Sequence, residues 1–217
     1  MEKSESAIKV VDLNPLFRPR SLAVIGISRE LTRGGGFIWW KIIHQGYKGK
    51  KFPISRSCDQ LGGIPCFRSL DEINEPIDLA IAAIPAAGVP ALLEDCAHKG
   101  IPFVIIHAAG FAELGADGRA LQETVLDLAR KHGIRLVGPN CMGVFCPEVR
   151  LNTIVEVEEE DDIPGNIAFC GQSGWATENF VASGAARGLR FSTVISSGNQ
   201  ADLNIVDFIS FFSNDPA

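Results

Sequence analysis

The 217-residue sequence lacks the features that mark membrane, secreted and nucleic-acid-binding proteins. No apolar run approaches the roughly 20 residues of a membrane span, and the polar first six residues lack the apolar stretch of a signal peptide. The six cysteines include no C-x-x-C pair and are too few for a disulfide scaffold, which indicates free thiols in a reducing cytoplasm. A net charge of −6 argues against a nucleic-acid partner. With 46% hydrophobic and 21% charged residues, the chain is expected to fold as one large or two small globular domains.

What the sequence does contain is a series of short apolar runs separated by amphipathic segments. The runs do not alternate apolar with polar residues, which is typical of strands buried on both faces of a parallel sheet. Strands are predicted at 21–26, 51–55, 78–85, 103–107 and 134–138, and helices at 37–45, 87–99 and 117–132. Each helix is followed by a glycine, the expected left-handed cap. This alternation predicts right-handed βαβ units and a doubly wound, Rossmann-like α/β sheet.

A second, shorter series follows an acidic run at 156–162, which is interpreted as a solvated linker. Strands are predicted at 166–170 and 190–196, and helices at 175–187 and 203–213. Two strands and two helices are too few to cover a parallel sheet, so the second domain is expected to be truncated. The predicted organisation is a first domain at 15–150, a linker at 151–164, and the first half of a flavodoxin-like parallel α/β domain at 165–217.

Ligands of open α/β sheets bind at the carboxyl ends of the strands. After the first strand, Arg33-Gly34-Gly35-Gly36 opens a helix whose free N–H groups suit a phosphate. The dinucleotide fingerprint G-x-G-x-x-G is absent, and so is the acidic residue that would hold a ribose. The second strand ends instead in Ser55-Arg56, which weakens the case for NAD and permits a ligand with an extra phosphate, such as NADP or coenzyme A. A flexible loop that merely starts the helix remains the alternative.

The charge pattern also favours a binding site at the carboxyl ends of the strands. Seven of the eight charged residues from 29 to 56 are basic, the exception being Glu30; the basic ones are Arg29, Arg33, Lys41, Lys48, Lys50, Lys51 and Arg56. This pattern favours a small polyanion, with a solvated helix end as the alternative. Of the histidines, only His107 ends a strand, and a packing role is expected for it. His44, His98 and His132 precede helix-ending glycines, where each is expected to interact with the helix macrodipole and the free carbonyl groups.

Several motifs together resemble the nucleoside-diphosphate-forming acyl-CoA synthetases, which include ADP-forming acetate–CoA ligase and the α subunit of succinyl-CoA synthetase. The resemblance covers nearly the whole chain from about Pro15. Its motifs are S-L-A-V-I-G-I-S at 21–28, D-L-A-I-A-A-I-P-A at 78–86, A-G-F-A-E at 109–113, G-P-N-C-M-G at 138–143, G-N-I-A-F-C-G-Q-S-G at 165–174 and S-G-N-Q-A-D at 197–202. Each motif alone is modest evidence, but their order and spacing together are strong.

The resemblance implies a CoA-binding Rossmann-like domain followed by flavodoxin-like ligase domains. It implies the conversion of a carboxylic acid, CoA and ATP to acyl-CoA, ADP and phosphate through an acyl phosphate and a phosphohistidine. The histidine is expected downstream of this chain, so no catalytic residue and no metal ligand is assigned here, and residues 1–217 alone are expected to be inactive. ATP, ADP and Mg²⁺ would bind outside this chain, on an ATP-grasp domain or subunit, and an oligomer is expected.

The same resemblance assigns residues to CoA and to phosphate. The expected CoA-binding residues are Gly26, Ser28, Arg29, Arg33, Gly34, Gly35, Ser55, Arg56, Pro85, Ala108, Ala109, Gly110, Asn140 and Cys141, and the expected phosphate turn is Gln172, Ser173 and Gly174. Two departures stand out: Ser55-Arg56 replaces the family's usual Asn-Pro, and Trp175 replaces a small residue after the Ser-Gly turn. The alternatives are a non-catalytic CoA-binding or regulatory module and, less favoured, an NADP-binding oxidoreductase.

Overall fold

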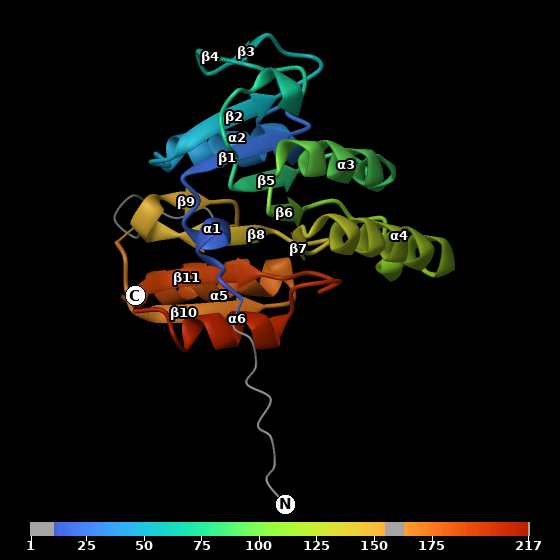
Figure 1. Ribbon diagram of the computed structural model, residues 1–217. Coiled ribbons are helices and arrows are strands. Elements are labelled where there is room, and N and C mark those ends of the chain that lie inside the picture. The colour runs from blue at the N-terminus through green and yellow to red at the C-terminus, as the bar shows by residue number, and fades with distance from the viewer. Residues whose placement is uncertain (1–10, 155–162, 217) are drawn as a thin grey trace, which may run out of the picture.

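The computed structural model describes residues 11–154 and 163–216 and contains two main β-sheets with helices packed around them (Figure 1). The first sheet has five strands in the order β2-β1-β5-β6-β7. Their bounds are β1 Ser21–Ile25, β2 Lys50–Ile54, β5 Leu79–Ala82, β6 Phe103–Ile106 and β7 Arg135–Val137. All neighbours are parallel. The predicted doubly wound sheet is confirmed, and its order changes direction between β1 and β5.

Helices cover both faces of this sheet, which explains why its strands are apolar throughout. Leu22 and Val24 of β1 share one apolar cluster with α1 (Asn14–Phe17) and α2 (Gly34–His44). Ala23 and Ile25 share the other cluster with α3 (Val89–Lys99) and α4 (Ala116–His132). At about 25 cal/mol per Å² of buried apolar area, two covered faces supply most of the driving force for folding.

The predicted helix ends are largely confirmed. Gly100 after α3 and Gly133 after α4 adopt left-handed conformations, with φ of 70° and 69°. Gly46 also has a positive φ, but it lies one residue beyond Gln45, the cap of α2. The short elements around the first sheet are the hairpin β3 (Gln60–Leu61) and β4 (Ile64–Pro65), and the 3-10 turns η1 (Leu70–Glu72), η2 (Ala86–Gly88) and η3 (Ala112–Leu114).

The second sheet is mixed rather than parallel. Strands β10 (Ile167–Gly171) and β11 (Phe191–Ser196) are parallel, but β11 pairs antiparallel with β8 (Gly143–Cys146), which pairs with β9 (Leu151–Asn152) through the turn η4 (Pro147–Val149). Neither β8 nor β9 was predicted. Leu151 and Asn152, assigned to the linker from sequence, are buried strand residues; the acidic run at 156–162 lies outside the described residues.

The two sheets share one continuous apolar core. Helices α5 (Gly174–Ala185) and α6 (Ile205–Phe212) belong to the second sheet, yet Phe208 and Phe211 of α6 pack on Phe17 of α1, with ring centroids 6.4 and 5.4 Å apart. Val144 of β8 and Ile195 of β11 belong to the same cluster as Leu22. The two parts of the described chain are therefore packed against each other through their interiors.

Hydrogen bonds and an ion pair add to the apolar packing between the two sheets. We call residues 197–203, which connect β11 to α6, the junction loop. Asp202 accepts two hydrogen bonds from Arg135 at 2.9 and 3.2 Å and one from the backbone N–H of Leu136 at 2.8 Å. The backbone N–H groups of Asn199 and Ala201 donate to the carbonyls of Pro139 and Gly138. The junction loop is thus bonded to the segment that leaves β7.

Glu113 ties the junction loop to a third segment. Its Oε1 accepts the N–H groups of Gly110 and Phe111 at 2.6 and 3.0 Å, and its Oε2 accepts Nδ2 of Asn199 at 2.6 Å. Burial would raise the pKa of this carboxyl, but the hydrogen bonds from Asn199, Phe111 and Gly110 outweigh burial and lower the pKa to about 2. A carboxylate therefore holds the loop after β6 against the junction loop.

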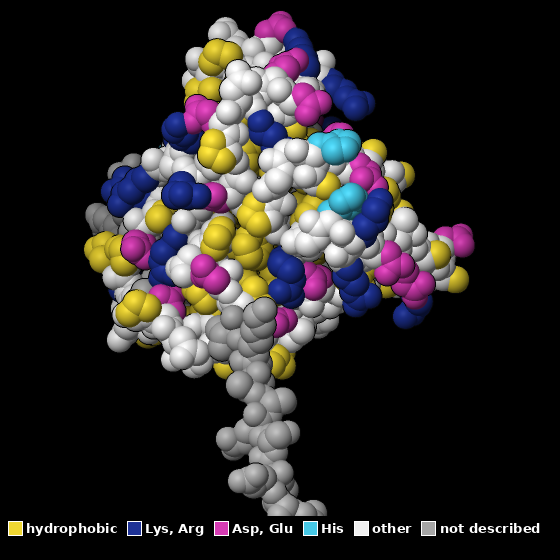
Figure 2. Space-filling view, viewed as in Figure 1, with side chains coloured by type: hydrophobic (Ala, Val, Ile, Leu, Met, Phe, Trp, Pro, Cys, Tyr) yellow, Lys and Arg dark blue, Asp and Glu magenta, His cyan; other side chains and the backbone are white. Residues whose placement is uncertain are grey.

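On the face shown in Figure 2, basic and acidic side chains are interspersed rather than gathered by sign. Among the helices of the described residues, none combines the length and the apolar character needed to cross a membrane.

We predict that Asp202→Ala lowers the free energy of unfolding by about 2–3 kcal/mol, because it leaves the half-buried Arg135 and the Leu136 N–H without their acceptor. Urea denaturation measures this change. Asp127→Ala, which removes an exposed carboxylate 3.8 Å from Arg130, is the matched control and should cost less than about 0.5 kcal/mol. Equal costs for the two variants would contradict the role given to Asp202.

Because the pKa of Glu113 is lowered, its contribution to the free energy of unfolding should decrease as the pH falls into the acid range. A group whose folded pKa lies below its unfolded value of about 4.3 stabilises the fold above that value and loses this effect as pH falls toward the folded pKa. The difference in unfolding free energy between wild type and Glu113→Gln should therefore be largest at pH 6 and shrink between about pH 4.5 and pH 2. Urea denaturation across this range measures it, with Glu123→Gln on α4 as the surface control. A difference that stays constant with pH would refute the assignment.

Candidate functional site

A cavity of about 530 Å³ opens at the carboxyl ends of β1, β2 and β5, where the strand order of the first sheet changes direction. We call it the β1–β2 cavity. Its wall contains predicted site residues from three separate segments: Gly26, Ser28, Arg56 and Pro85. The structure thus brings together, at one edge, residues that are up to 59 positions apart in the sequence.

Two glycines let the loop after β1 approach the first turn of α2. Gly26 has a φ of 93°, and a Cβ atom there would lie 2.4 Å from the carbonyl oxygen of Ala83. A Cβ atom on Gly35 would lie 2.5 Å from the carbonyl oxygen of Gly26. Only glycine fits at both positions, so the N–H groups that begin α2 lie directly beside the end of β1. Such a helix start attracts anions.

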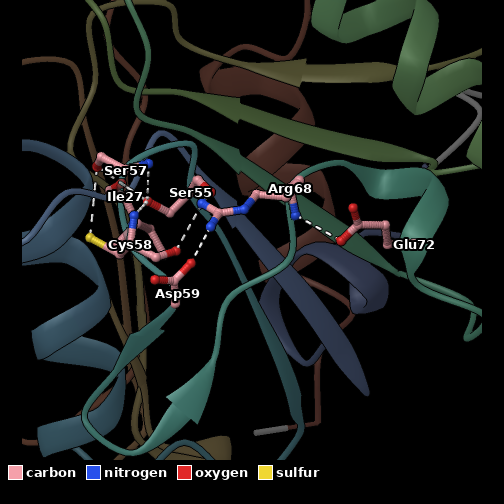
Figure 3. A network of polar contacts seen from close by, with 7 residues as sticks. All are labelled: Ile27, Ser55, Ser57, Cys58, Asp59, Arg68 and Glu72. Carbon is pink, nitrogen blue, oxygen red and sulfur yellow. Dashed lines mark hydrogen bonds and ion pairs between the residues drawn. The ribbon is translucent and has the colours of Figure 1, made fainter.

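Figure 3 shows a polar network that fixes the loop after β2 beside this cavity. Ser55 is buried, and its hydroxyl donates to the carbonyl oxygen of Ile27 at 2.7 Å. Arg68 donates through Nη1 to the carbonyl oxygens of Ser55 and Cys58 at 2.9 and 3.1 Å, and it also pairs with Asp59. Ser55 therefore joins β2 to β1, while Arg68, which sequence reasoning missed, lines the cavity.

The arginines named from sequence occupy different places. Arg56 is exposed on the cavity wall. Arg33 precedes α2 and pairs with Glu30 at 2.8 Å while its side chain stays largely exposed. Arg29 lies beside Cys58: burial acts to raise the pKa of that thiol, but hydrogen bonds with Ser57, Ser55 and Arg29 outweigh burial and lower the pKa.

Three of the seven basic residues in the predicted basic stretch lie away from the cavity. Lys50 and Lys51 begin β2, at the opposite end of the strand from the cavity, and Lys50 pairs with Glu75. Lys48 donates to the carbonyl oxygen of Glu148. Residues close in sequence lie far apart here, because the five-residue strand β2 places its first residues at the amino end and its last residues at the carboxyl end of the parallel strands.

A second cavity, of about 310 Å³, lies between α2 and the carboxyl ends of β5 and β6. We call it the α2 cavity. Ile84 lines both cavities, and the predicted residues Gly34 and Ala108 line this one. Lys41, counted in the basic stretch but not assigned to the site from sequence, also lines this cavity and is buried. It is the single cation within the run F-I-W-W-K-I-I, and this apolar surrounding is the signal in the sequence that its side chain is buried.

The G-P-N-C turn at 138–141 follows β7, the last strand in the order of the first sheet. The N–H of Asn140 donates to the carbonyl oxygen of Ala108 at 2.9 Å, which places this exposed residue next to the predicted segment 108–110. Cys141 is buried, and its thiol lies 3.4 Å from the carbonyl oxygen of Ile106. Burial raises the pKa of Cys141 to about 12, so the thiol stays protonated at neutral pH.

The predicted phosphate turn lies beside the same region. Ser173 caps α5, accepting the N–H of Ala176 at 3.3 Å, and Gln172 accepts the N–H of Gly198 from the junction loop. A Cβ atom on Gly174 would lie 2.5 Å from Cγ of Met142, which itself lines the α2 cavity. One side chain therefore separates the start of α5 from the α2 cavity.

Comparison with known protein families gives two matches. Residues 20–147 match the CoA binding domain family, and residues 164–217 match the succinyl-CoA ligase like flavodoxin domain family. The chain is 34% identical, over 94% of its length, to the alpha subunit of ADP-forming acetate–CoA ligase I from Pyrococcus furiosus. It is 34% identical, over 93%, to an ADP-forming 4-hydroxybutyrate–CoA ligase from Nitrosopumilus maritimus, and 30% identical, over 94%, to a trans-feruloyl-CoA synthase from an unknown prokaryotic organism. The chain spans 45%, 29% and 29% of these relatives, less than half of each.

Solved structures agree with these matches. The dinucleotide forming acetyl-coenzyme A synthetase 1 of Ca. Korarchaeum cryptofilum, in complex with phosphate and ADP, superposes with a TM-score of 0.87 at 32% identity, covering 94% of this chain and 43% of that one. An ATP citrate lyase from Methanothrix soehngenii shares the fold, with a TM-score of 0.68 at 14% identity, covering 90% of this chain and 34% of that one. The chain belongs to the CoA-binding domain family, its residues 164–217 match the succinyl-CoA ligase like flavodoxin domain family, and it is similar over both segments to ADP-forming acyl-CoA synthetases.

Proposed function

We propose that this chain is the CoA-binding part of an ADP-forming acyl-CoA synthetase. The complete enzyme would convert a carboxylic acid, CoA and ATP to acyl-CoA, ADP and phosphate through an acyl phosphate and a phosphohistidine. The observation that carries the proposal is the pair of cavities that meet at Ile84 along the carboxyl edge of the first sheet, beside the start of α2. A long ligand with phosphates near its middle fits this arrangement.

In this proposal the adenosine end of CoA occupies the β1–β2 cavity. Arg56 and Arg68 line that cavity and would face the phosphate on the ribose, since charge-assisted bonds from guanidinium groups suit phosphate oxygens. The diphosphate would lie against the first N–H groups of α2, at Gly34 and Gly35, with Arg33 nearby. The pantetheine arm would pass Ile84 and Ala108 toward Asn140, which brings the thiol near the phosphate turn.

The turn Gln172-Ser173-Gly174 would receive the phosphoryl group. Twelve-residue α5 presents the N–H groups of its first turn there, and the hydroxyl of Ser173 caps that turn. The acyl phosphate and the CoA thiol would thus meet near Met142. ATP, Mg²⁺ and the phosphate-carrying histidine would belong to parts of the enzyme outside this chain, including an ATP-grasp domain or subunit, and the assembly would be an oligomer.

The proposal places the enzyme in the cytoplasm, where its six free cysteines would stay reduced. Family membership leaves the acid open, because the relatives are named for acetate, 4-hydroxybutyrate and trans-feruloyl groups of different size.

The direct test is calorimetric titration of the chain with CoA and with NAD. We expect CoA to bind and NAD to bind at least tenfold more weakly, because the glycine fingerprint and the ribose-binding acid are absent while two arginines line the β1–β2 cavity. Dephospho-CoA, which lacks the ribose phosphate, is the control and should bind more weakly than CoA. Tighter binding of NAD than of CoA would overturn the proposal.

Arg33 offers a second test. If it bonds the diphosphate, Arg33→Ala should remove a charge-assisted hydrogen bond of about 1.5–3 kcal/mol and raise the Kd for CoA about tenfold or more. Arg130→Ala, on the exposed face of α4, is the matched loss of a surface arginine and should leave the Kd unchanged. The role would be disproved if Arg33→Ala bound CoA as tightly as wild type, because Arg33 would then serve only its pair with Glu30.

A further inference from the structure

Asn140 is held in an uncommon backbone conformation beside the α2 cavity. Its φ is 58°, in the left-handed region that asparagine tolerates better than most residues other than glycine. Its N–H donates to the carbonyl oxygen of Ala108, which lines the α2 cavity. A Cβ atom on Gly198 of the junction loop would lie 2.5 Å from the carbonyl oxygen of Asn140. The backbone of this exposed residue is therefore fixed between the loop after β6 and the junction loop.

The side chain of Asn140 is the last of three polar side chains that are bonded in a row. Asn199 donates through Nδ2 to Oε2 of Glu113 at 2.6 Å and to Oε1 of Gln122 at 3.0 Å. Because acceptors take its amide nitrogen, the amide oxygen of Asn199 faces the other way, where Nδ2 of Asn140 donates to it at 3.4 Å. We call Glu113, Asn199 and Asn140 the amide relay.

Glu113 sets the direction of both amides in the relay. Its Oε1 accepts the backbone N–H groups of Gly110 and Phe111, which leaves Oε2 for the relay. An ionised carboxylate only accepts hydrogen bonds, so Asn199 presents Nδ2 to Glu113 and its oxygen to Asn140. Asn140 in turn presents Nδ2 to Asn199, and its own Oδ1 points away from the relay.

The amide oxygen of Asn140 is thus the end of the relay that is available to a ligand. Among the described residues, none donates a hydrogen bond to this oxygen. In the proposed function, the pantetheine arm of CoA passes Ile84 and Ala108 toward Asn140. That arm is uncharged and carries amide N–H groups, and an amide oxygen is an acceptor suited to such donors.

We propose that the amide relay orients Asn140 so that its Oδ1 accepts a hydrogen bond from an amide N–H of the pantetheine arm, which places the CoA thiol beside Met142. Asn140 would touch the cofactor, whereas Glu113 and Asn199 are positioning residues that act through it. This inference rests on the proposed function and names the groups that recognise the arm.

The first test compares CoA with adenosine 3′,5′-bisphosphate, which has the adenosine and the ribose phosphate but no pantetheine arm. Asn140→Gly removes the amide, and glycine keeps the left-handed backbone without strain. Calorimetry should show a Kd for CoA raised about fivefold to tenfold, as expected for one lost hydrogen bond, and an unchanged Kd for the bisphosphate. Asn214→Ala, at an exposed asparagine after α6, is the control and should change neither Kd. The inference fails if Asn140→Gly binds CoA as tightly as wild type, or if both ligands lose affinity equally.

The second test separates a positioning role of Glu113 from a purely structural one. Glu113→Gln puts an N–H donor in place of Oε2, facing Nδ2 of Asn199, so both relay amides should turn over and Asn140 should present Nδ2 to the arm. The Kd for CoA should rise about as much as in Asn140→Gly, and combining the two substitutions should raise it no further, because Glu113 acts through Asn140. Glu123→Gln on α4 is the charge-matched control. Additive losses in the double variant would refute the positioning role.

Exchanging the charge along the relay provides a rescue. Asn199→Asp alone sets two carboxylates side by side and should weaken CoA binding. In Glu113→Gln/Asn199→Asp, the new amide donates to the new carboxylate, which again accepts Nδ2 of Asn140, so the Kd for CoA should return to within about twofold of wild type. A double variant that binds CoA as weakly as the single variants would refute the relay.

Two outcomes remain distinct from these. If Asn199→Asp does not fold, the combination of Asn140→Gly with Glu113→Gln decides the inference alone. If neither CoA nor the bisphosphate binds to the wild-type chain, the proposed function itself is refuted.

Discussion

The junction loop is the constraint on which the candidate site depends, because it fixes the carboxyl edge of the first sheet relative to the start of α5. Asp202 bonds to β7, the backbone of Asn199 and Ala201 bonds to the G-P-N-C turn, and the side chain of Asn199 reaches Glu113. Gly198 also donates to Gln172 in the phosphate turn. The segments after β6 and β7, which adjoin the α2 cavity, and the turn that precedes α5 are therefore bonded to one short loop. A lost contact in this loop would shift one half of the site against the other.

This arrangement separates charge from apolar space. The starts of α2 and α5 present N–H groups at the rim of the site, and Arg33, Arg56 and Arg68 lie on that rim or in the β1–β2 cavity. These are the places where phosphate groups are stabilised. The α2 cavity between them is mostly apolar and has one ammonium group, already bonded to Ile154. The anionic groups of a ligand would thus face N–H groups and arginines, whereas its carbon chain would face the apolar wall of the α2 cavity.

Sequence reasoning located the first sheet well because its physical signal is local. A strand covered on both faces must be apolar throughout, and a helix that ends in a left-handed turn favours glycine, as Gly100 and Gly133 do. Strand β8 was not predicted because β11, with which it pairs, lies about 50 positions downstream, and β9 was not predicted because it has only two residues. The pairing of β8 with β11 determines where β8 lies, and a local sequence pattern cannot predict such a distant pairing.

The site was predicted in outline for the same reason, and its details depend on contacts across the chain. Gly26, Gly34, Pro85 and Ala108 follow strands or open a helix, so topology alone sends them to one edge. Which side chains line that edge is a separate matter: Ser55 turns inward to Ile27, whereas Arg68, from beyond the β3–β4 hairpin, bonds to the carbonyl oxygens of Ser55 and Cys58 and lines the cavity.

His107 shows how such packing sets chemistry. Its position at the end of β6 follows from the sequence, but its neutrality follows from burial and from Lys41, which lies 66 residues earlier and on another element. A second positive charge beside Lys41 would face strong repulsion at low effective dielectric. The wall of the α2 cavity can therefore hold a cation and an imidazole side by side, because only one of the two groups is charged.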